Sequence, residues 1–279
     1  MDDASPLPDP RPGGPREPPG LAVPRGGSGP GSPRGAPGPV AGPDAAAASW
    51  AAWWDGPTGF DLEGWRRDTE AFVRAALPVL APTASDVLLD LGCGPGFALE
   101  ALAPRMREAV GADVAPRLLD LARARLGGRS NVSLVGLDPA APGDLAGLGP
   151  ARFTLVVVHS VVQYLPDDDA VDALLRAVRG VVVPGARVLV SDVPRGGGRV
   201  ADVFGLLRGA ARQGRLREAL GRILRLRRSS YAAARARLGL LVPDAARLRR
   251  TVEGLGGTVE EVAAPLSILA NRRHLLVRF

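Results

Sequence analysis

The chain has 279 residues, enough for one sizeable α/β domain with additional segments, and its single cysteine, Cys93, excludes an internal disulfide framework. The formal net charge is +6, and every one of the 35 basic residues is an arginine. Because Ala, Gly and Pro are also abundant and only 4% of the residues are aromatic, we attribute the charge to compositional bias and expect no nucleic-acid partner.

The first 45 residues predict a disordered tail, which precedes a folded domain over residues 46–279. Pro, Gly, Arg, Ala and Ser make up most of this tail, without the apolar periodicity of an ordered element. Residues 1–6 show no secretory signal, and no apolar run in the chain reaches the roughly 18 residues that span a bilayer. We therefore expect a cytoplasmic protein without stable membrane anchoring.

Helices and strands are predicted to alternate along most of the domain. A cluster of tryptophans at residues 50–54 precedes a helix over residues 62–77 that ends at Pro78. Strands are expected at residues 87–91, 109–113, 131–137, 153–159 and 187–192, separated by helices at 97–102, 116–126 and 170–179. A helix over residues 244–253 then precedes two strands, 258–263 and 274–279.

This order predicts an α/β fold with a seven-stranded, mostly parallel, Rossmann-like sheet and helices on both of its faces. The last two strands have no helix between them. Since a parallel pair needs a crossover connection, we expect an antiparallel C-terminal hairpin.

A glycine-rich turn from Asp90 to Gly96 is the most informative motif. Glycine allows the backbone to approach a ligand closely in conformations that other residues avoid. The glycines Gly92, Gly94 and Gly96 follow a G-x-G-x-G spacing. A dinucleotide-binding turn needs G-x-G-x-x-G, and Phe97 stands where its third glycine belongs. The spacing therefore argues against a nicotinamide dinucleotide as the ligand.

Acidic residues follow the next two predicted strands. Asp113 lies at the end of the second strand, where a carboxylate can accept hydrogen bonds from both ribose hydroxyls of a nucleoside. The alternative is a cap on the helix that begins at Pro116. Asp138 follows the third strand, and its alternative role is a simple Asp-Pro turn.

Together and in this order, the motifs resemble the class I S-adenosylmethionine-dependent methyltransferases that act on small molecules, over about residues 50–279. The resemblance implies S-adenosylmethionine as the cofactor and no metal. In that family, the position of Asp138 lies near the adenine amino group, and Leu137 would pack on the adenine ring. The cofactor-binding residues implied are Asp90, Gly92, Cys93, Gly94, Gly96, Asp113, Val114, Leu137, Asp138 and His159.

Three residues are candidates for catalysis. His159 ends the fourth strand and is our first candidate for a base that removes a proton from the acceptor. Its alternative role is to orient the loop or contact the cofactor. Tyr164 and Asp192 are candidates on the substrate side, although Asp192 could equally be a turn residue. We expect His274, the second histidine, to lie at the surface.

The arginine-rich segment over residues 196–241 departs from simpler members of this family. Its residues Leu216, Leu220, Ile223 and Leu224 have the spacing of an apolar helix face. This helical insertion could be a lid whose arginines hold an acidic substrate, an interfacial helix on anionic lipid, or a helix packed on the sheet edge with a solvated basic face.

We therefore predict S-adenosylmethionine-dependent methyl transfer to a small-molecule acceptor, at oxygen or nitrogen, by in-line displacement. An NAD(P)-dependent oxidoreductase and a non-catalytic binding protein with the same fold are the alternatives. The sequence does not identify the acceptor or the oligomeric state.

Overall fold

A computed structural model describes residues 49–59, 61–141, 143–196, 203–205, 207, 220, 221, 223 and 229–279. The expected N-terminal tail, over residues 1–45, lies outside the described residues. So do the arginines from Arg199 to Arg228 on which the interpretation of the 196–241 segment rests. Within the described part of the chain, no helix has the length and apolar character needed to cross a membrane.

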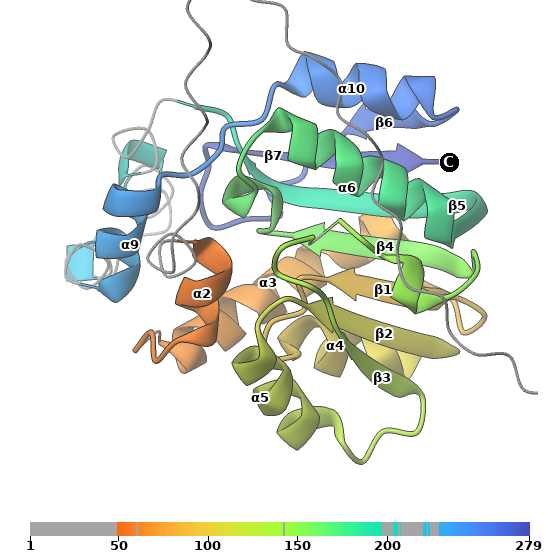
Figure 1. Ribbon diagram of the computed structural model, residues 1–279, viewed down its shortest axis with the longest axis horizontal. Helices are drawn as coiled ribbons and strands as arrows, with labels where there is room; N and C mark the ends of the chain where they lie inside the picture. The colour runs from red at the N-terminus through yellow and green to blue at the C-terminus, as the bar shows by residue number, and fades with distance from the viewer. Residues whose placement is uncertain are drawn as a thin grey trace, which may run out of the picture. The chain divides into compact units, whose positions relative to one another are not determined.

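The domain is built on a seven-stranded sheet with the order β3-β2-β1-β4-β5-β7-β6 (Figure 1). Its strands are β1 (Val87–Leu91), β2 (Glu108–Asp113), β3 (Val132–Gly136), β4 (Phe153–His159), β5 (Val182–Pro194), β6 (Thr258–Glu261) and β7 (Arg272–Arg278). Neighbouring strands are parallel, except that β7 is antiparallel to both β5 and β6. The predicted sheet and its antiparallel hairpin are therefore confirmed.

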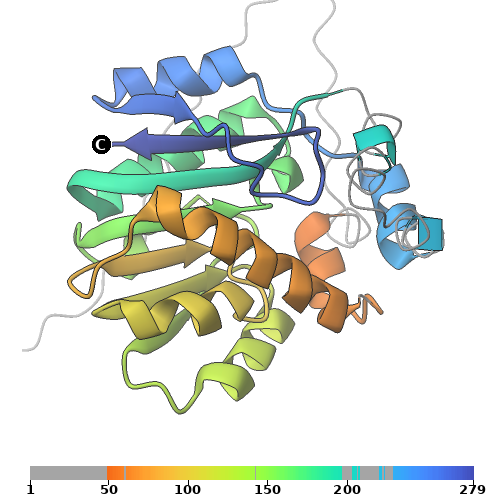
Figure 2. The same ribbon diagram turned by 180° about the vertical axis from the view of Figure 1, so that it is seen from behind.

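Helices cover both faces of the sheet (Figures 1 and 2). The described helices longer than one 3₁₀ turn are α2 (Trp50–Asp55), α3 (Leu62–Leu80), α4 (Phe97–Leu102), α5 (Pro116–Leu126), α6 (Asp168–Val181), α9 (Ser230–Leu238) and α10 (Ala245–Gly254). Phe72 of α3 and Leu99 of α4 share one buried cluster, whereas Leu175 of α6 and Leu248 of α10 share the other. Because helices cover both faces, the central strand β1 is buried at every position.

The helix expected over about residues 62–77, with Pro78 and Pro82 at its end, extends past Pro78 to Leu80 and ends before Pro82. A proline inside a helix removes one backbone hydrogen bond. Here the last turn buries Leu80 completely in the core, and this burial offsets the loss. The helix ends at Ala81, whose left-handed backbone (φ 44°) directs its N–H group to the carbonyl of Leu77.

The strand order reverses between β1 and β4, and ligands of open α/β sheets bind at the carboxyl ends of strands near such a point. Helices α2 and α9 lie at this edge, outside the two layers that cover the sheet (Figure 1). They are joined through Trp50, whose indole Nε1 donates to the carbonyl of Gly239, 3.0 Å away, directly after α9. The fold thus places α2 and α9 beside the carboxyl ends of the strands.

Candidate functional site

The glycine turn connects β1 to α4 and borders a cavity of about 1610 Å³. Gly92, Gly94 and Gly96 all have positive φ angles, 76°, 52° and 80°, which L side chains rarely adopt. A Cβ atom on Gly92 would lie 2.4 Å from the Val161 side chain. Gly92 and Gly94 line the cavity, whereas Gly96 packs against α5 and is absent from the wall.

Two carboxylates flank this turn. Asp90 is 3% exposed, and its Oδ2 atom has no hydrogen-bond partner among the described residues. Burial, followed by repulsion from Asp113, raises the pKa of Asp90 to about 7. The carboxylate of Asp113 accepts hydrogen bonds from the backbone N–H groups of Gly94 (2.8 Å) and Ala115 (2.9 Å). Burial nevertheless raises the pKa of Asp113, because desolvation outweighs these bonds.

The other residues implied for cofactor binding lie in different positions around the cavity. Cys93, Val114 and Leu137 line it, and burial raises the pKa of the Cys93 thiol. Asp138 is exposed and is not part of the wall, although its neighbours in sequence are. Its Oδ1 accepts a hydrogen bond from the Ala140 N–H group at 2.8 Å, which is the local Asp-Pro turn considered above.

The ends of β4 and β5 bring together further polar groups at the cavity. His159 stacks on Phe72, with ring centroids 3.7 Å apart, and its Nδ1 lies 3.2 Å from Ser191 Oγ. Burial lowers the pKa of His159 to about 4, so the imidazole is neutral at physiological pH. Asp192 also lines the cavity, accepts a hydrogen bond from Ser160 Oγ, and forms an ion pair with Arg272.

A β-bulge shapes this part of β5. Ser191 and Asp192 together oppose the single residue His274 of β7, because the pairing shifts between Val190 and Val193. Asp192 has a left-handed backbone, with φ 64°. Bulges often redirect side chains beside active sites, and this one accompanies Asp192 at the cavity wall.

The expectation that His274 lies at the surface was wrong. Its residue is 5% exposed, and its Nδ1 lies 2.9 Å from Ser191 Oγ and 3.2 Å from the Asp192 backbone nitrogen. Burial lowers its pKa. The error arose because β7 lies between β5 and β6, which covers a residue that local sequence placed beside two arginines.

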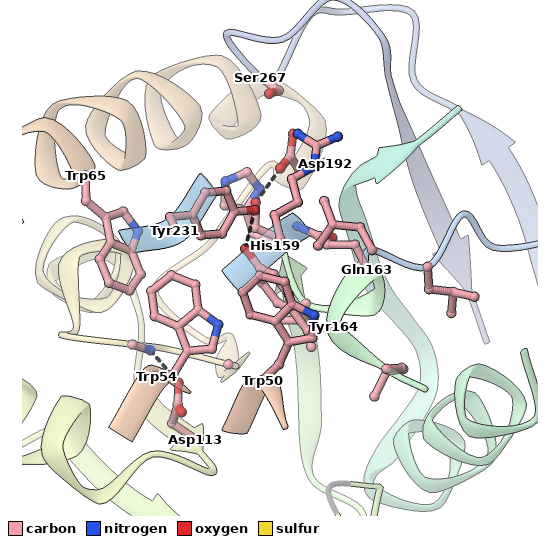
Figure 3. A pocket seen from close by; sticks show the side chains of 18 of the residues that line it. Trp50, Trp54, Trp65, Asp113, His159, Gln163, Tyr164, Asp192, Tyr231 and Ser267 are labelled. Atoms are coloured by element: carbon pink, nitrogen blue, oxygen red, sulfur yellow. Dashed lines mark hydrogen bonds between the residues drawn. The ribbon is translucent and has the colours of Figure 1, made fainter. Parts of the chain in front are cut away.

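Aromatic side chains form a third part of the wall (Figure 3). Tyr164, from the 3₁₀ turn after β4, and Tyr231, from α9, place their hydroxyl oxygens 3.2 Å apart. The Trp50 ring lies 4.8 Å from the Tyr164 ring and 5.6 Å from the Tyr231 ring, centroid to centroid. Burial raises the pKa of both phenols, so they are protonated at neutral pH. Tyr164, a candidate on the substrate side, therefore lies at the cavity wall.

Sequence reasoning missed Tyr231 and Gln163. Tyr231 is one of the chain's two tyrosines and lies within the 196–241 segment. The prediction for that segment was based on its arginines and its apolar spacing, not on this tyrosine. Gln163 is next to Tyr164 in the strand-four segment, is 4% exposed and lines the cavity. Its Oε1 has no hydrogen-bond partner among the described residues. The polar residues of the segment after the fourth strand could have identified Gln163. Tyr231 reaches the cavity only through long-range packing, which no local pattern shows.

The sheet order, the antiparallel β7 and the glycine turn with its two carboxylates define a Rossmann-like methyltransferase fold. Residues 89–188 match the sequence family described as a methyltransferase domain. This part of the chain is therefore similar to the class I S-adenosylmethionine-dependent methyltransferases, whose cofactor is S-adenosylmethionine.

Similar proteins agree with this class. A ubiquinone biosynthesis O-methyltransferase of Xylella fastidiosa (strain 9a5c) is 29% identical over 155 residues, which cover 54% of this chain and 58% of that protein. Chondramide synthase cmdD of Chondromyces crocatus is 30% identical over 151 residues, which are 48% of this chain and 4% of the synthase. The chain therefore spans only part of these relatives.

The fold also resembles solved structures. The structure of DhpI in complex with SAH superposes with a TM-score of 0.53 at 15% sequence identity. The match covers 82% of this chain and 94% of DhpI. At this identity the likeness concerns the fold, and the acceptor must be inferred from the cavity.

Proposed function

We propose that the protein transfers the methyl group of S-adenosylmethionine to an oxygen or nitrogen atom of a small molecule. The strongest support comes from Asp90, a buried carboxylate beside the glycine turn with one oxygen unpartnered among the described residues. Leaving such a group unpaired is costly, so a ligand with a positively charged or hydrogen-bond-donating group suits it. S-adenosylmethionine has both an ammonium and a sulfonium group.

The remaining donor-side residues fit the other parts of this cofactor. A carboxylate has about four lone-pair positions, and Asp113 uses two of them for backbone N–H groups, so it can still accept from ribose hydroxyls. Val114 and Leu137 provide apolar surface beside it for the adenine. When bound, the cofactor supplies a methyl carbon that its sulfonium has activated toward displacement.

The protein's own contribution is chiefly alignment. Holding two reactants in the correct orientation can remove roughly 7–11 kcal/mol of a barrier, whereas a positioned base contributes about 10²–10⁴-fold. His159, Tyr164 and Asp192 also line the cavity. We assign them to the acceptor, with His159 receiving the hydrogen bond of the group that is methylated.

The aromatic and apolar lining of the cavity favours a small molecule over a macromolecular acceptor. Trp50 of α2 and Tyr231 of α9 line the cavity, and Leu266 lines it from the loop between β6 and β7. We further propose that residues 46–279 act as one domain, in which the described residues Phe204, Leu207, Ile223 and Tyr231 of the 196–241 segment cover the acceptor.

Calorimetry separates this function from its alternatives. S-adenosylhomocysteine should bind the protein, and NAD(P) should not. Binding of NAD(P) alone would make the protein a nicotinamide enzyme, and binding of neither would favour a non-catalytic protein. Transfer of a labelled methyl group to members of an acceptor panel then tests the reaction itself.

The role of Asp113 is tested with a matched pair of variants. Asp113→Ala should weaken S-adenosylhomocysteine binding roughly 10–100-fold, since hydrogen bonds to charged groups contribute about 1.5–3 kcal/mol. Asp120→Ala removes an exposed carboxylate from α5 that pairs only with Arg123 among the contacts described, and it should leave the affinity unchanged. Equal affinities in the two variants would remove Asp113 from the cofactor site.

A further inference from the structure

We propose that the acceptor is a planar aromatic compound that presents a hydroxyl or N–H group to Gln163. This inference rests on the methyl transfer proposed above. Ligand cavities commonly measure about 300–1,000 Å³, and this one measures about 1610 Å³. It therefore has room for the cofactor and for a second molecule of comparable size.

The walls on the acceptor side are aromatic and come from three separate elements. Trp50 and Trp54 belong to α2, Tyr164 to the turn after β4, and Tyr231 to α9. Trp54 lies 5.6 Å from Tyr164 and 6.3 Å from Tyr231, centroid to centroid. Figure 3 shows these rings gathered between Asp113 and Asp192. Such rings favour a flat, apolar ligand, since aromatic pairs contribute about 0.5–1.5 kcal/mol beyond the area that they bury.

Gln163 supplies the polar requirement. Gln163 lines the cavity, and its side-chain Oε1 is buried and unpartnered among the described residues. An amide oxygen accepts hydrogen bonds and cannot donate them, so its ligand must bring a donor. A phenol or an aromatic amine offers both the flat ring and this donor.

Three matched probes test this acceptor class in protein saturated with S-adenosylhomocysteine: 2-naphthol, decahydro-2-naphthol and 2-methoxynaphthalene. Calorimetry should show 2-naphthol binding at least about fivefold more tightly than either analogue, because one lacks the aromatic ring and the other the donor. Gln163→Met should remove the preference over 2-methoxynaphthalene. Trp54→Leu should weaken the binding of 2-naphthol more than Trp53→Leu does, since Trp53 is not part of the cavity wall.

Equal binding of the saturated alcohol would overturn the aromatic acceptor, and an unchanged preference in Gln163→Met would overturn the role of Gln163. Because each measurement begins with bound S-adenosylhomocysteine, either failure leaves the proposed methyl transfer intact. Failure of S-adenosylhomocysteine to bind would instead contradict the function itself.

A separate observation supports a second inference: we infer that Ser191 and His274 are positioning residues that fix the tautomer of His159. The contacts form a chain from the Asp192 N–H group to His274 Nδ1, from there to Ser191 Oγ, and on to His159 Nδ1. Ser191 is fully buried, so this chain excludes water.

The hydrogen positions follow from what each group can donate. A backbone N–H group can only donate, so His274 Nδ1 must be an acceptor without a hydrogen. The hydroxyl hydrogen of Ser191 then donates to His274 Nδ1 as well. Because Ser191 has only this one hydrogen, its oxygen accepts from His159 Nδ1. His159 therefore has its hydrogen on Nδ1, and its Nε2 presents a bare lone pair.

This tautomer suits the proposed role of His159. None of the described residues bonds its Nε2 atom, and the residue lines the cavity. A neutral imidazole with a bare Nε2 can accept the hydrogen of an acceptor hydroxyl or amine, whereas the other tautomer could not. Asp68, Asp192 and His274 are the ionisable groups that act electrostatically on His159.

Nuclear magnetic resonance with nitrogen-15 ring-labelled histidine tests the relay directly, because the chain has only two histidines. At neutral pH, His159 should give the spectrum of the Nδ1–H tautomer and His274 that of the Nε2–H tautomer. A wild-type spectrum with His159 as the Nε2–H tautomer would overturn the inference, whatever reaction the protein catalyses.

A pair of variants then tests the cause. His274→Asn keeps an acceptor oxygen near the position of Nδ1, and His159 should keep its tautomer. His274→Phe removes the acceptor, so Ser191 is free to donate to His159 Nδ1, and Nε2–H should appear. Turnover should fall at least about tenfold in His274→Phe and recover in His274→Asn, with unchanged S-adenosylhomocysteine affinity. An unchanged His159 spectrum in His274→Phe would contradict the relay.

Discussion

The hydroxyl of Ser160 donates a hydrogen bond to the carboxylate of Asp192, and both residues have left-handed backbones, with φ angles of 57° and 64°. Residues other than glycine pay of order 1–3 kcal/mol for such conformations, which concentrate at functional sites. The bond joins the end of β4 to the bulge of β5 at the cavity wall. It thus holds two strained backbones in one fixed arrangement on the acceptor side.

Asp192→Asn should destabilise the protein by about 3 kcal/mol. Asparagine tolerates the left-handed backbone and can still accept from Ser160, but it removes the charge that pairs with the buried Arg272 guanidinium. Urea unfolding measures the change. Asp120→Asn, which breaks an exposed pair with Arg123, is the control and should cost less than about 1 kcal/mol. Similar effects in both variants would mean that the Asp192 charge has no special role in stability.

Gly92→Ala should destabilise the fold by about 2–5 kcal/mol. The new Cβ would require a left-handed backbone and would lie 2.4 Å from Val161. Thermal unfolding provides the measurement. Gly128→Ala is the matched control, because Gly128 has no positive φ and no atom lies within 4 Å of the added Cβ. If both variants unfolded alike, the glycine turn would not be constrained as described.

Binding of S-adenosylhomocysteine should strengthen as the pH rises toward about 7. Asp90, with a pKa of about 7 in the ligand-free protein, must lose its proton to pair with the ligand's ammonium group. Calorimetry in buffers of different ionisation enthalpy should therefore detect proton release at pH 6. Asp90→Asn should abolish that release, and release that persists in this variant would point to Asp113 instead.

The same group affects the stability of the ligand-free protein in the opposite direction. The folded state keeps the Asp90 proton up to about pH 7, whereas the unfolded chain loses it near 3.8. Between these values the native state binds more protons, so this contribution to the free energy of unfolding falls as the pH rises. Urea unfolding at pH 5 and pH 7.5 should show a smaller decline in Asp90→Asn than in the unaltered protein.

The rate should show no ionisation of His159 near pH 6.5. Burial places its pKa at about 4, so the neutral base is present throughout the range above pH 5 and is lost only as the pH falls through 4. His159→Gln should lower turnover about 10²–10⁴-fold and leave S-adenosylhomocysteine affinity nearly unchanged. Loss of both properties would make His159 a cofactor-binding or structural residue.

The donor side could be predicted from the sequence because it is local. Asp90 and the glycines lie within one strand and one turn, and Asp113 ends the next strand of the same sheet. Parallel strand ends meet at one edge, so strand assignment alone brings these residues together. Asp138 is the exception, because its carboxylate forms its own turn and is not part of the wall.

The acceptor side depends on contacts that no short pattern specifies. His274, on a strand that packs beside β5, lies 82 positions after Asp192 in the chain, and Tyr231 lies 67 positions after Tyr164. The bulge at Asp192 arises from a shift in pairing between two strands, and neither strand sequence shows it alone. The sequence therefore named His159 and Asp192 as candidates but not the groups that hold them.

The antiparallel direction of β7 also determines which part of the chain could be exchanged to change the acceptor. Because β7 runs opposite to β5, the loop that leads into it reaches the cavity, and Leu266, Ser267 and Ile268 form part of the wall. Strands anchor this loop at both ends, and it is remote in sequence from the glycine turn. Exchanging residues 262–271 should therefore alter which acceptors fit while the glycine turn and its two carboxylates keep their own sequence.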